Sequence, residues 1–160
     1  MNQPALSGQD SQPIWHPHVT VATVVAHDDR FLMVEEIVQG RRVLNQPAGH
    51  LEPGESLPAA ALRETLEETG WHVELRHFLG VSQWTSGTLH FLRFAFAASA
   101  LRHEPDRALD EGIVAALWLR RDEIAAAGNL RSPMVLANID AFLARRWWPL
   151  DALQYLDRPR

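Results

Sequence analysis

The chain has 160 residues, of which 46% are apolar and 22% are charged, an ordinary composition for one globular domain. A formal net charge of −5 argues against a protein that holds nucleic acid polymers through phosphate contacts. There is no cysteine, which excludes disulfides, thiol nucleophiles and thiolate metal sites. There is also no lysine, since all 15 basic residues are arginine, and this excludes Schiff-base chemistry.

The first 13 residues are polar and rich in Gly, Pro, Ser and Gln, and we expect them to form a disordered leader. They lack the basic start and the apolar run of a secretory signal peptide. No apolar stretch reaches the ~18 residues that a membrane-spanning helix needs. These features, together with the missing cysteines, predict a cytoplasmic protein that does not contact membranes.

Three segments before residue 50 have the β-branched, alternating composition that is typical of strands: 18–26, 30–37 and 43–46. The next segment, 49–71, reads as a Gly/Pro-rich loop that leads into a helix. Ser56 is a suitable N-cap, Pro58 lies in the first turn, and Gly70 ends the helix.

This helix collects acidic side chains on one side. At about 100° per residue, Glu64, Glu67 and Glu68 fall within an arc of roughly 100°. Hard divalent cations such as Mg²⁺ prefer oxygen ligands of this kind. The alternative is an ordinary solvated acidic face. Arg63 lies one turn before Glu67 and is placed to hold its carboxylate.

The opposite side of the helix carries Leu62 and Leu66, which we expect to anchor it in the core. On the acidic side, Ala60 and Ala61 are small enough to let another segment approach.

Three more strands are predicted after the helix, at 73–84 with a bend at Gly80, at 89–97 and at 113–119. A charged loop covers 102–112, and two helices follow, at 121–127 and 132–147. This order of elements predicts one α/β layered domain over residues 14–148, followed by a C-terminal tail at 149–160.

The strand at 89–97 contains an arginine within an apolar sequence. Its period of two places Phe91, Arg93 and Ala95 on one face, and Phe94 and Phe96 on the other. A buried guanidinium needs a partner, because an unpaired buried charge is costly. Arg93 therefore holds either a substrate phosphate or a structural carboxylate.

Three further positions are candidates for the site. Arg131 directly precedes a helix, where backbone N–H groups also attract anions, although it can equally be part of a plain helix start. Trp84, with Phe91, can stack on a ring of the substrate or belong to the core. Glu111, next to Asp110, is a candidate general base, with a helical glutamate or activation by metal alone as the alternatives.

The segment 49–71 resembles the box of the Nudix hydrolases, G-x5-E-x7-R-E-U-x-E-E-x-G-U, where U is bulky and apolar. The matching positions are Gly49, Glu55, Arg63, Glu64, Glu67, Glu68 and Gly70. The polar Thr65 and the large Trp71 depart mildly from the U positions. Spacing this specific makes the resemblance the strongest signal in the chain.

The resemblance implies a Nudix-type α/β/α sandwich on a mixed β-sheet. It implies a site for Mg²⁺ or Mn²⁺ made by four residues: Gly49 through its carbonyl, Glu64, Glu67 and Glu68. Catalysis would involve four residues: Glu64, Glu67, Arg63 and Glu111. Substrate binding would involve Arg93, Arg131 and Trp84. The partner would be a small phosphorylated substrate, and the protein would be a monomer or homodimer.

Within the family, the sequence is similar to a bacterial phosphatase subgroup through 18–22, 45–52, 91–94 and 129–133. This similarity implies removal of phosphate from nucleoside di- and triphosphates, thiamine pyrophosphate or its pyrimidine precursor pyrophosphate. The alternatives are a pyrophosphatase of nucleoside triphosphates or ADP-sugars, and a ligand sensor without turnover. The sensor is disfavoured because every glutamate of the box is present.

Overall fold

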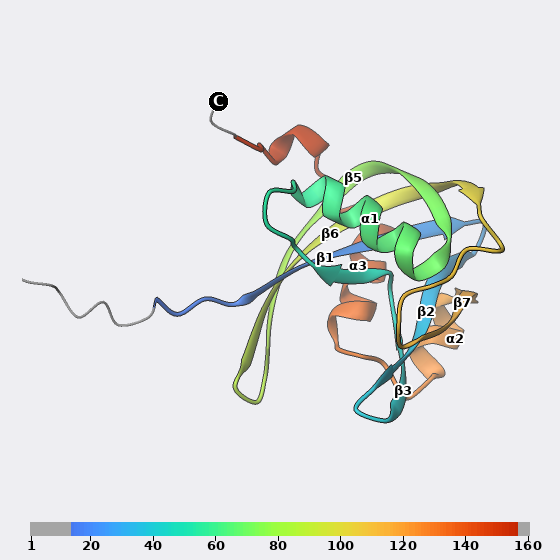
Figure 1. Cartoon of the computed structure of the whole chain (residues 1–160). Helices are drawn as coiled ribbons and strands as arrows, with labels where there is room; N and C mark the ends of the chain where they lie inside the picture. The colour runs from blue at the N-terminus through green and yellow to red at the C-terminus, as the bar shows by residue number, and fades with distance from the viewer. Residues whose placement is uncertain (1–13, 157–160) are drawn as a thin grey trace, which may run out of the picture.

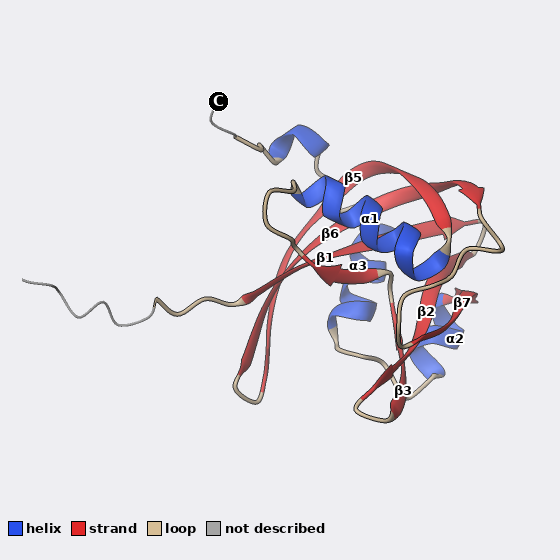
Figure 2. Cartoon of the chain, viewed as in Figure 1, coloured by secondary structure: helices blue, strands red, loops and turns tan. Residues whose placement is uncertain are grey.

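The structure is a computed structural model, and it describes residues 14–156, so the predicted leader at 1–13 lies outside the described residues. Its strands form one seven-stranded sheet (Figures 1 and 2). They are β1 (His18–His27), β2 (Arg30–Val38), β3 (Arg41–Asn45), β4 (Ala48–His50), β5 (Trp71–Ser86), β6 (Leu89–His103) and β7 (Ile113–Arg120). The order is β3-β2-β1-β6-β5, with β4 paired to β1 and β7 to β2. Because β1 and β6 are parallel and the other pairs antiparallel, the sheet is mixed, as predicted.

Helices cover both faces of this sheet. They are α1 (Leu57–Thr69), α2 (Arg121–Ala126) and α3 (Met134–Leu143), followed by a 3₁₀ turn, η1 (Leu150–Ala152). On one face Ala60 and Ala61 of α1 pack against a cluster that includes Phe96 of β6. On the other face Val135 and Ile139 of α3 join a cluster with other sheet residues. The predicted single-domain α/β/α sandwich is therefore confirmed.

The packing face of α1 differs from the prediction. Leu62 is 39% exposed and Leu66 is only half-buried, whereas Thr65 is fully buried. The Thr65 hydroxyl donates to the Ala61 carbonyl over 2.7 Å and lies 2.8 Å from the Thr23 hydroxyl of β1. Small residues on this face bring the helix close to the sheet, and the acids lie on the buried side rather than opposite it. The prediction that Leu62 and Leu66 anchor the helix was therefore wrong.

We expect Thr65→Val to destabilise the fold by about 1–2 kcal/mol, because it leaves the buried Thr23 hydroxyl without its partner. Leu62→Ala on the exposed side should change the free energy of unfolding by no more than about 0.5 kcal/mol. Urea denaturation of both variants measures the difference. A larger loss for Leu62→Ala than for Thr65→Val would contradict this description of the helix.

Several element boundaries also depend on contacts that are distant in sequence. The predicted helix at 132–147 ends at Leu143, and Arg145 has a positive φ of 52°. Beyond it, the Trp148 backbone exchanges hydrogen bonds of 2.8 and 2.9 Å with Phe78 of β5. β4 lies within what was predicted to be loop, and β6 continues to His103, so the predicted loop at 102–112 begins later. No helix in the range 14–156 is long and apolar enough to cross a membrane.

Residues of the predicted C-terminal tail pack against the sandwich. Leu150 and Leu153 contact the cluster that contains Phe78 and Phe96. The Tyr155 hydroxyl donates to the Gly54 carbonyl over 3.2 Å. Residues 153–155 thus lie beside the loop that precedes α1.

Candidate active site

Helix α1 begins and ends as its sequence predicts. The Ser56 hydroxyl accepts a hydrogen bond from the Ala59 N–H at 3.2 Å, which caps the first turn. Gly70 adopts the left-handed conformation, with a φ of 70°, and its N–H donates to the Leu66 carbonyl. These caps set the length of the helix and hence the direction in which its acids point.

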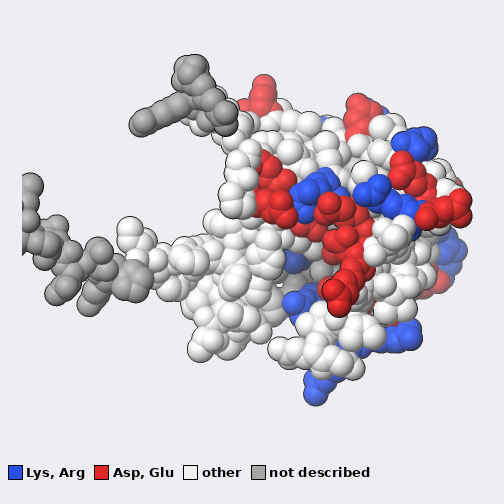
Figure 3. Space-filling model, viewed as in Figure 1, with Lys and Arg blue, Asp and Glu red and all other residues white. Residues whose placement is uncertain are grey.

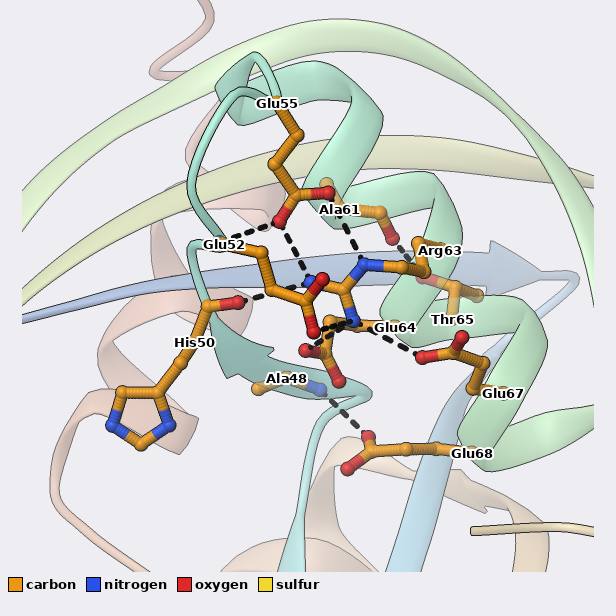
Figure 4. Close-up of polar contacts among 10 residues, drawn as sticks. All are labelled: Ala48, His50, Glu52, Glu55, Ala61, Arg63, Glu64, Thr65, Glu67 and Glu68. Carbon is orange, nitrogen blue, oxygen red and sulfur yellow. Dashed lines mark hydrogen bonds and ion pairs between the residues drawn. The ribbon is translucent and has the colours of Figure 1, made fainter.

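Arg63 is the centre of the polar network around α1 (Figure 4). Its Nε and Nη2 donate to the two carboxylate oxygens of Glu55 at 3.1 and 2.7 Å. Its Nη1 donates to Glu64 at 2.8 Å and to Glu67 at 3.0 Å, and its Nη2 also reaches the His50 carbonyl at 3.0 Å. These carboxylates raise the pKa of Arg63 further above its usual value. Arg63 therefore holds Glu67, as predicted, and ties the loop to the helix.

Three carboxylates form a group that can hold a metal ion. One oxygen each from Glu64, Glu67 and Asp110 lies within 4.8 Å of the others. The Asp110 N–H donates to the Glu67 carbonyl over 3.1 Å, which attaches the loop before β7 to α1. Burial raises the pKa of Glu64, because a charged carboxylate loses hydration there. The negative charges of these carboxylates repel one another, and a hard divalent cation bound between them would neutralise that repulsion.

Gly49 lies on β4 opposite Val21 of β1 and directly under the Glu64 carboxyl group. A Cβ atom at position 49 would overlap with this carboxyl group. Glycine is therefore required for Glu64 to sit against the backbone of β4. The metal-ligand role of the Gly49 carbonyl stays a prediction.

Glu68 is not part of the three-carboxylate group. Its Oε2 accepts a hydrogen bond from the Ala48 N–H at 2.8 Å, and the side chain is 8% exposed. Burial raises the pKa of Glu68 to about 9. In this arrangement Glu68 joins the end of α1 to β4, and it also lines the cavity described next.

A cavity of about 320 Å³ opens beside these acids. Its lining residues are Thr20, Glu36, Asn45, Ala48, Gly49, His50, Glu52, Glu64, Glu68, Trp84, Phe91, Arg93, Arg131, Ser132 and Met134. Figure 3 shows arginine atoms inside a hollow of the surface, next to a band of acidic residues. The cavity therefore combines an acidic wall with a basic one.

Arg93 provides the buried positive charge of this cavity. It is 6% exposed, and its only side-chain hydrogen bond among residues 14–156 is from Nε to the Thr20 hydroxyl, at 3.4 Å. No carboxylate in that range lies within 4 Å of it, so the structural ion pair considered from the sequence does not form. Loss of hydration lowers the pKa of Arg93 to about 10, which leaves it charged at neutral pH.

The other predicted substrate residues also line the cavity. Arg131 is exposed at its rim, with Nε 3.9 Å from a Glu36 carboxylate oxygen. Trp84 stacks on Phe91 with ring centroids 5.4 Å apart. Glu111, in contrast, is exposed and lies outside both the cavity lining and the carboxylate group.

Some site residues were not predicted. Asp110 was considered only beside Glu111 as a base, and not as a partner of the helical glutamates. Asn45 and Ser132 lie in two segments that carry the subgroup resemblance, but they were not predicted as site residues. Nothing in their local spacing shows that they meet in one cavity.

Comparison with known proteins agrees with this geometry. A family model described as the NUDIX domain matches residues 16–139. Phosphatase NudJ of Escherichia coli strain K12 is 41% identical over 141 residues, which are 88% of this chain and 92% of that protein. A solved NUDIX hydrolase from Nitrosomonas europaea is 46% identical with a TM-score of 0.85, covering 88% of this chain and 98% of that one. A MutT NUDIX hydrolase from Burkholderia pseudomallei, at 22% identity and a TM-score of 0.63, covers 81% of this chain and 98% of that one and shares the fold.

These matches show that the chain is a hydrolase of phosphoanhydride bonds. The chain belongs to the Nudix hydrolase family.

Proposed function

We propose that this chain uses Mg²⁺ to hydrolyse the diphosphate linkage of small substrates, releasing a terminal phosphate. The substrates would be nucleoside di- and triphosphates, thiamine pyrophosphate or its pyrimidine precursor pyrophosphate. The observation that carries the proposal is one cavity with carboxylates at one wall and the unpaired, buried Arg93 at the other. Likeness to a protein named Phosphatase NudJ supports phosphate release.

The carboxylates of Glu64, Glu67 and Asp110 would hold the cation, with the Gly49 carbonyl and Glu68 beside them. When bound, a divalent ion lowers the pKa of water and neutralises phosphate charge. Arg63 keeps Glu64 and Glu67 in place through its hydrogen bonds.

Proton transfer from water falls to a carboxylate of this wall. Arg63 binds three glutamates, of which Glu64 and Glu67 belong to the carboxylate group. Glu67 is the more exposed of these two, at 32% against 11% for Glu64, and we assign it as the proton acceptor. Glu111 is the base candidate from the sequence, but it is exposed and lies outside the carboxylate group. Its neighbour Asp110 belongs to that group, so we favour Asp110 over Glu111 for a role in the site.

Arg93 would bind a phosphate, with Arg131 at the rim in support. A guanidinium offers several N–H donors in one plane and binds phosphate oxygens in pairs. The wall formed by Trp84 and Phe91 would hold the organic part of the substrate by stacking.

The test is to incubate the protein with thiamine pyrophosphate, a nucleoside diphosphate or a nucleoside triphosphate, with and without Mg²⁺. We expect release of orthophosphate with Mg²⁺ and loss of activity in excess EDTA. Release of pyrophosphate from a nucleoside triphosphate would instead indicate the alternative pyrophosphatase. Binding of these compounds without any turnover in Mg²⁺ or Mn²⁺ would indicate the ligand sensor.

A further inference from the structure

Three buried polar atoms of the cavity lining have no hydrogen-bond partner among residues 14–156. They are Asn45 Oδ1, Arg93 Nη1 and Ser132 Oγ. Their side chains are 4%, 6% and 5% exposed. Buried polar groups are nearly always hydrogen-bonded, because an unmet donor or acceptor is costly. These three atoms are themselves buried, so a ligand in the cavity completes them only when their side chains turn toward it.

The orientation of the Asn45 amide follows from its neighbour. Its Nδ2 donates to a Glu36 carboxylate oxygen at 3.2 Å, and an ionised carboxylate can only accept. Oδ1 is therefore the atom left without a partner, and it requires a donor from the ligand. Arg93 Nη1 requires an acceptor, and the Ser132 hydroxyl can donate.

These residues are held in fixed positions relative to one another. The Leu44 N–H donates to the Asn129 carbonyl at 3.0 Å, and the Arg131 N–H donates to the Leu44 carbonyl at 2.9 Å. The segment before α3 is thus joined to β3 as a short parallel bridge between Leu44 and Leu130. Gln46 strengthens the connection, because its Nε2 donates to the Val135 carbonyl at 2.9 Å. Asn45 and Ser132 are therefore held on two joined segments before a ligand arrives.

We propose that Asn45, Arg93 and Ser132 form a subsite for the unesterified terminal phosphate of the substrate, bound with one proton on it. Phosphate oxygens accept from Arg93 and Ser132, and the P–OH group donates to Asn45 Oδ1. This inference rests on the proposed function and adds the residues that select the end of the diphosphate. A phosphate esterified on both sides has no such proton near neutral pH, whereas a terminal phosphate, with a second pKa of about 6, retains it in part.

The local charge agrees with an anionic occupant. Arg93 and the rim residue Arg131 supply two positive charges here, against the two acids Glu36 and Glu68 that act on Arg93. Glu36 is itself occupied by the Asn45 amide. The three-carboxylate group belongs to the other wall and would repel a free anion unless a cation is bound.

The experiment is a calorimetric titration of the full chain with inorganic phosphate and with sulfate, at pH 7 in EDTA. The two anions have similar size, but sulfate carries no proton at this pH and presents only acceptors to Asn45 Oδ1. We expect phosphate to bind about tenfold or more tightly than sulfate. Equal affinity for the two anions, or no binding of phosphate up to tens of millimolar, would overturn the proposal.

Two variants separate the roles of the residues. Asn45→Leu removes the acceptor, so the ratio of phosphate to sulfate affinity should fall to about one. Ser132→Ala removes a donor that serves both anions, so both affinities should fall, by about tenfold, with the ratio preserved. Ser86→Ala, which changes an exposed serine at the end of β5 outside the cavity lining, is the matched control and should leave both affinities unchanged. If Asn45→Leu does not fold, the pattern for Ser132→Ala still decides, since unchanged affinities there would contradict the subsite.

These titrations use no turnover and no metal, so their failure is distinguishable from failure of the proposed function. A chain that hydrolyses diphosphates with Mg²⁺ but does not distinguish phosphate from sulfate would retain the function and lose the subsite. Substrates whose terminal phosphate is esterified, such as nucleotide sugars, provide a second comparison in the active enzyme. We expect a nucleoside diphosphate to have a kcat/KM at least about tenfold above that of the corresponding nucleotide sugar.

Discussion

Replacing Glu64 by glutamine is expected to lower kcat by about 10³, which corresponds to ~4 kcal/mol of lost transition-state stabilisation. Glutamine has nearly the same shape and keeps an oxygen that can accept from Arg63 Nη1, now at 2.8 Å. The substitution removes a negative charge from the group of Glu64, Glu67 and Asp110. Affinity for the cation should therefore fall together with kcat, and titration with Mn²⁺ measures the affinity directly.

The neighbouring acids Asp110 and Glu111 form the matched pair for this experiment. Asp110→Asn should reduce Mn²⁺ affinity and kcat, because its carboxylate lies with Glu64 and Glu67. Glu111→Gln changes an exposed side chain outside this group, and we expect kcat within about twofold of the parent. A large loss for Glu111→Gln, with a small one for Glu64→Gln, would reverse the assignment of the site.

Replacing Arg93 by methionine is expected to reduce kcat/KM by about 10² or more on every diphosphate substrate, since ~2.7 kcal/mol of phosphate binding is lost. The same change should leave the melting temperature unchanged or raise it. Arg93 is 6% exposed and lacks a carboxylate partner within the range 14–156, so its burial costs stability. A residue that is costly to the fold and needed for activity has the signature of a binding group.

Two further variants complete this test. Arg93→Lys should recover only part of the activity, because lysine keeps the charge and loses the planar pair of donors. Arg76→Met changes an exposed arginine of β5 that pairs with Glu74, and it should alter neither activity nor melting temperature. If Arg93→Met lowered the melting temperature strongly while a folded sample kept its kcat/KM, Arg93 would be structural.

The conformation of the acidic helix follows from short-range rules. Three features set this conformation: the Ser56 cap, the left-handed Gly70 and the hydrogen bond from Arg63 to Glu67. Each of them involves residues no more than four positions apart. Such features depend on helix geometry alone, so the sequence predicts them. The spacing of the Nudix box predicts the glutamates of the site for the same reason.

The face that α1 buries could not be predicted in this way. Apolar periodicity predicts that the side of Leu62 and Leu66 is buried. In the structure the side that packs on the sheet is that of Ala60, Ala61 and Thr65. Close approach to β1, and the hydrogen bond between Thr65 and Thr23, outweigh the apolar area that two leucines would bury. Which face of α1 is buried depends on the shape of the sheet, and a short stretch of sequence does not reveal that shape.

The sequence by itself therefore determined the family, the order of the elements and the acids of α1. Only the tertiary structure decided which residues of other elements lie near these acids and around the cavity. Asp110 reaches Glu67 through the loop before β7, and the bridge between Leu44 and Leu130 joins the segments that carry Asn45 and Ser132. These partners lie about 40 to 90 positions apart in the chain, and their meeting depends on strand order and on parallel pairing of β1 with β6. Contacts of that range arise from packing of whole layers, and local propensity carries no information about them.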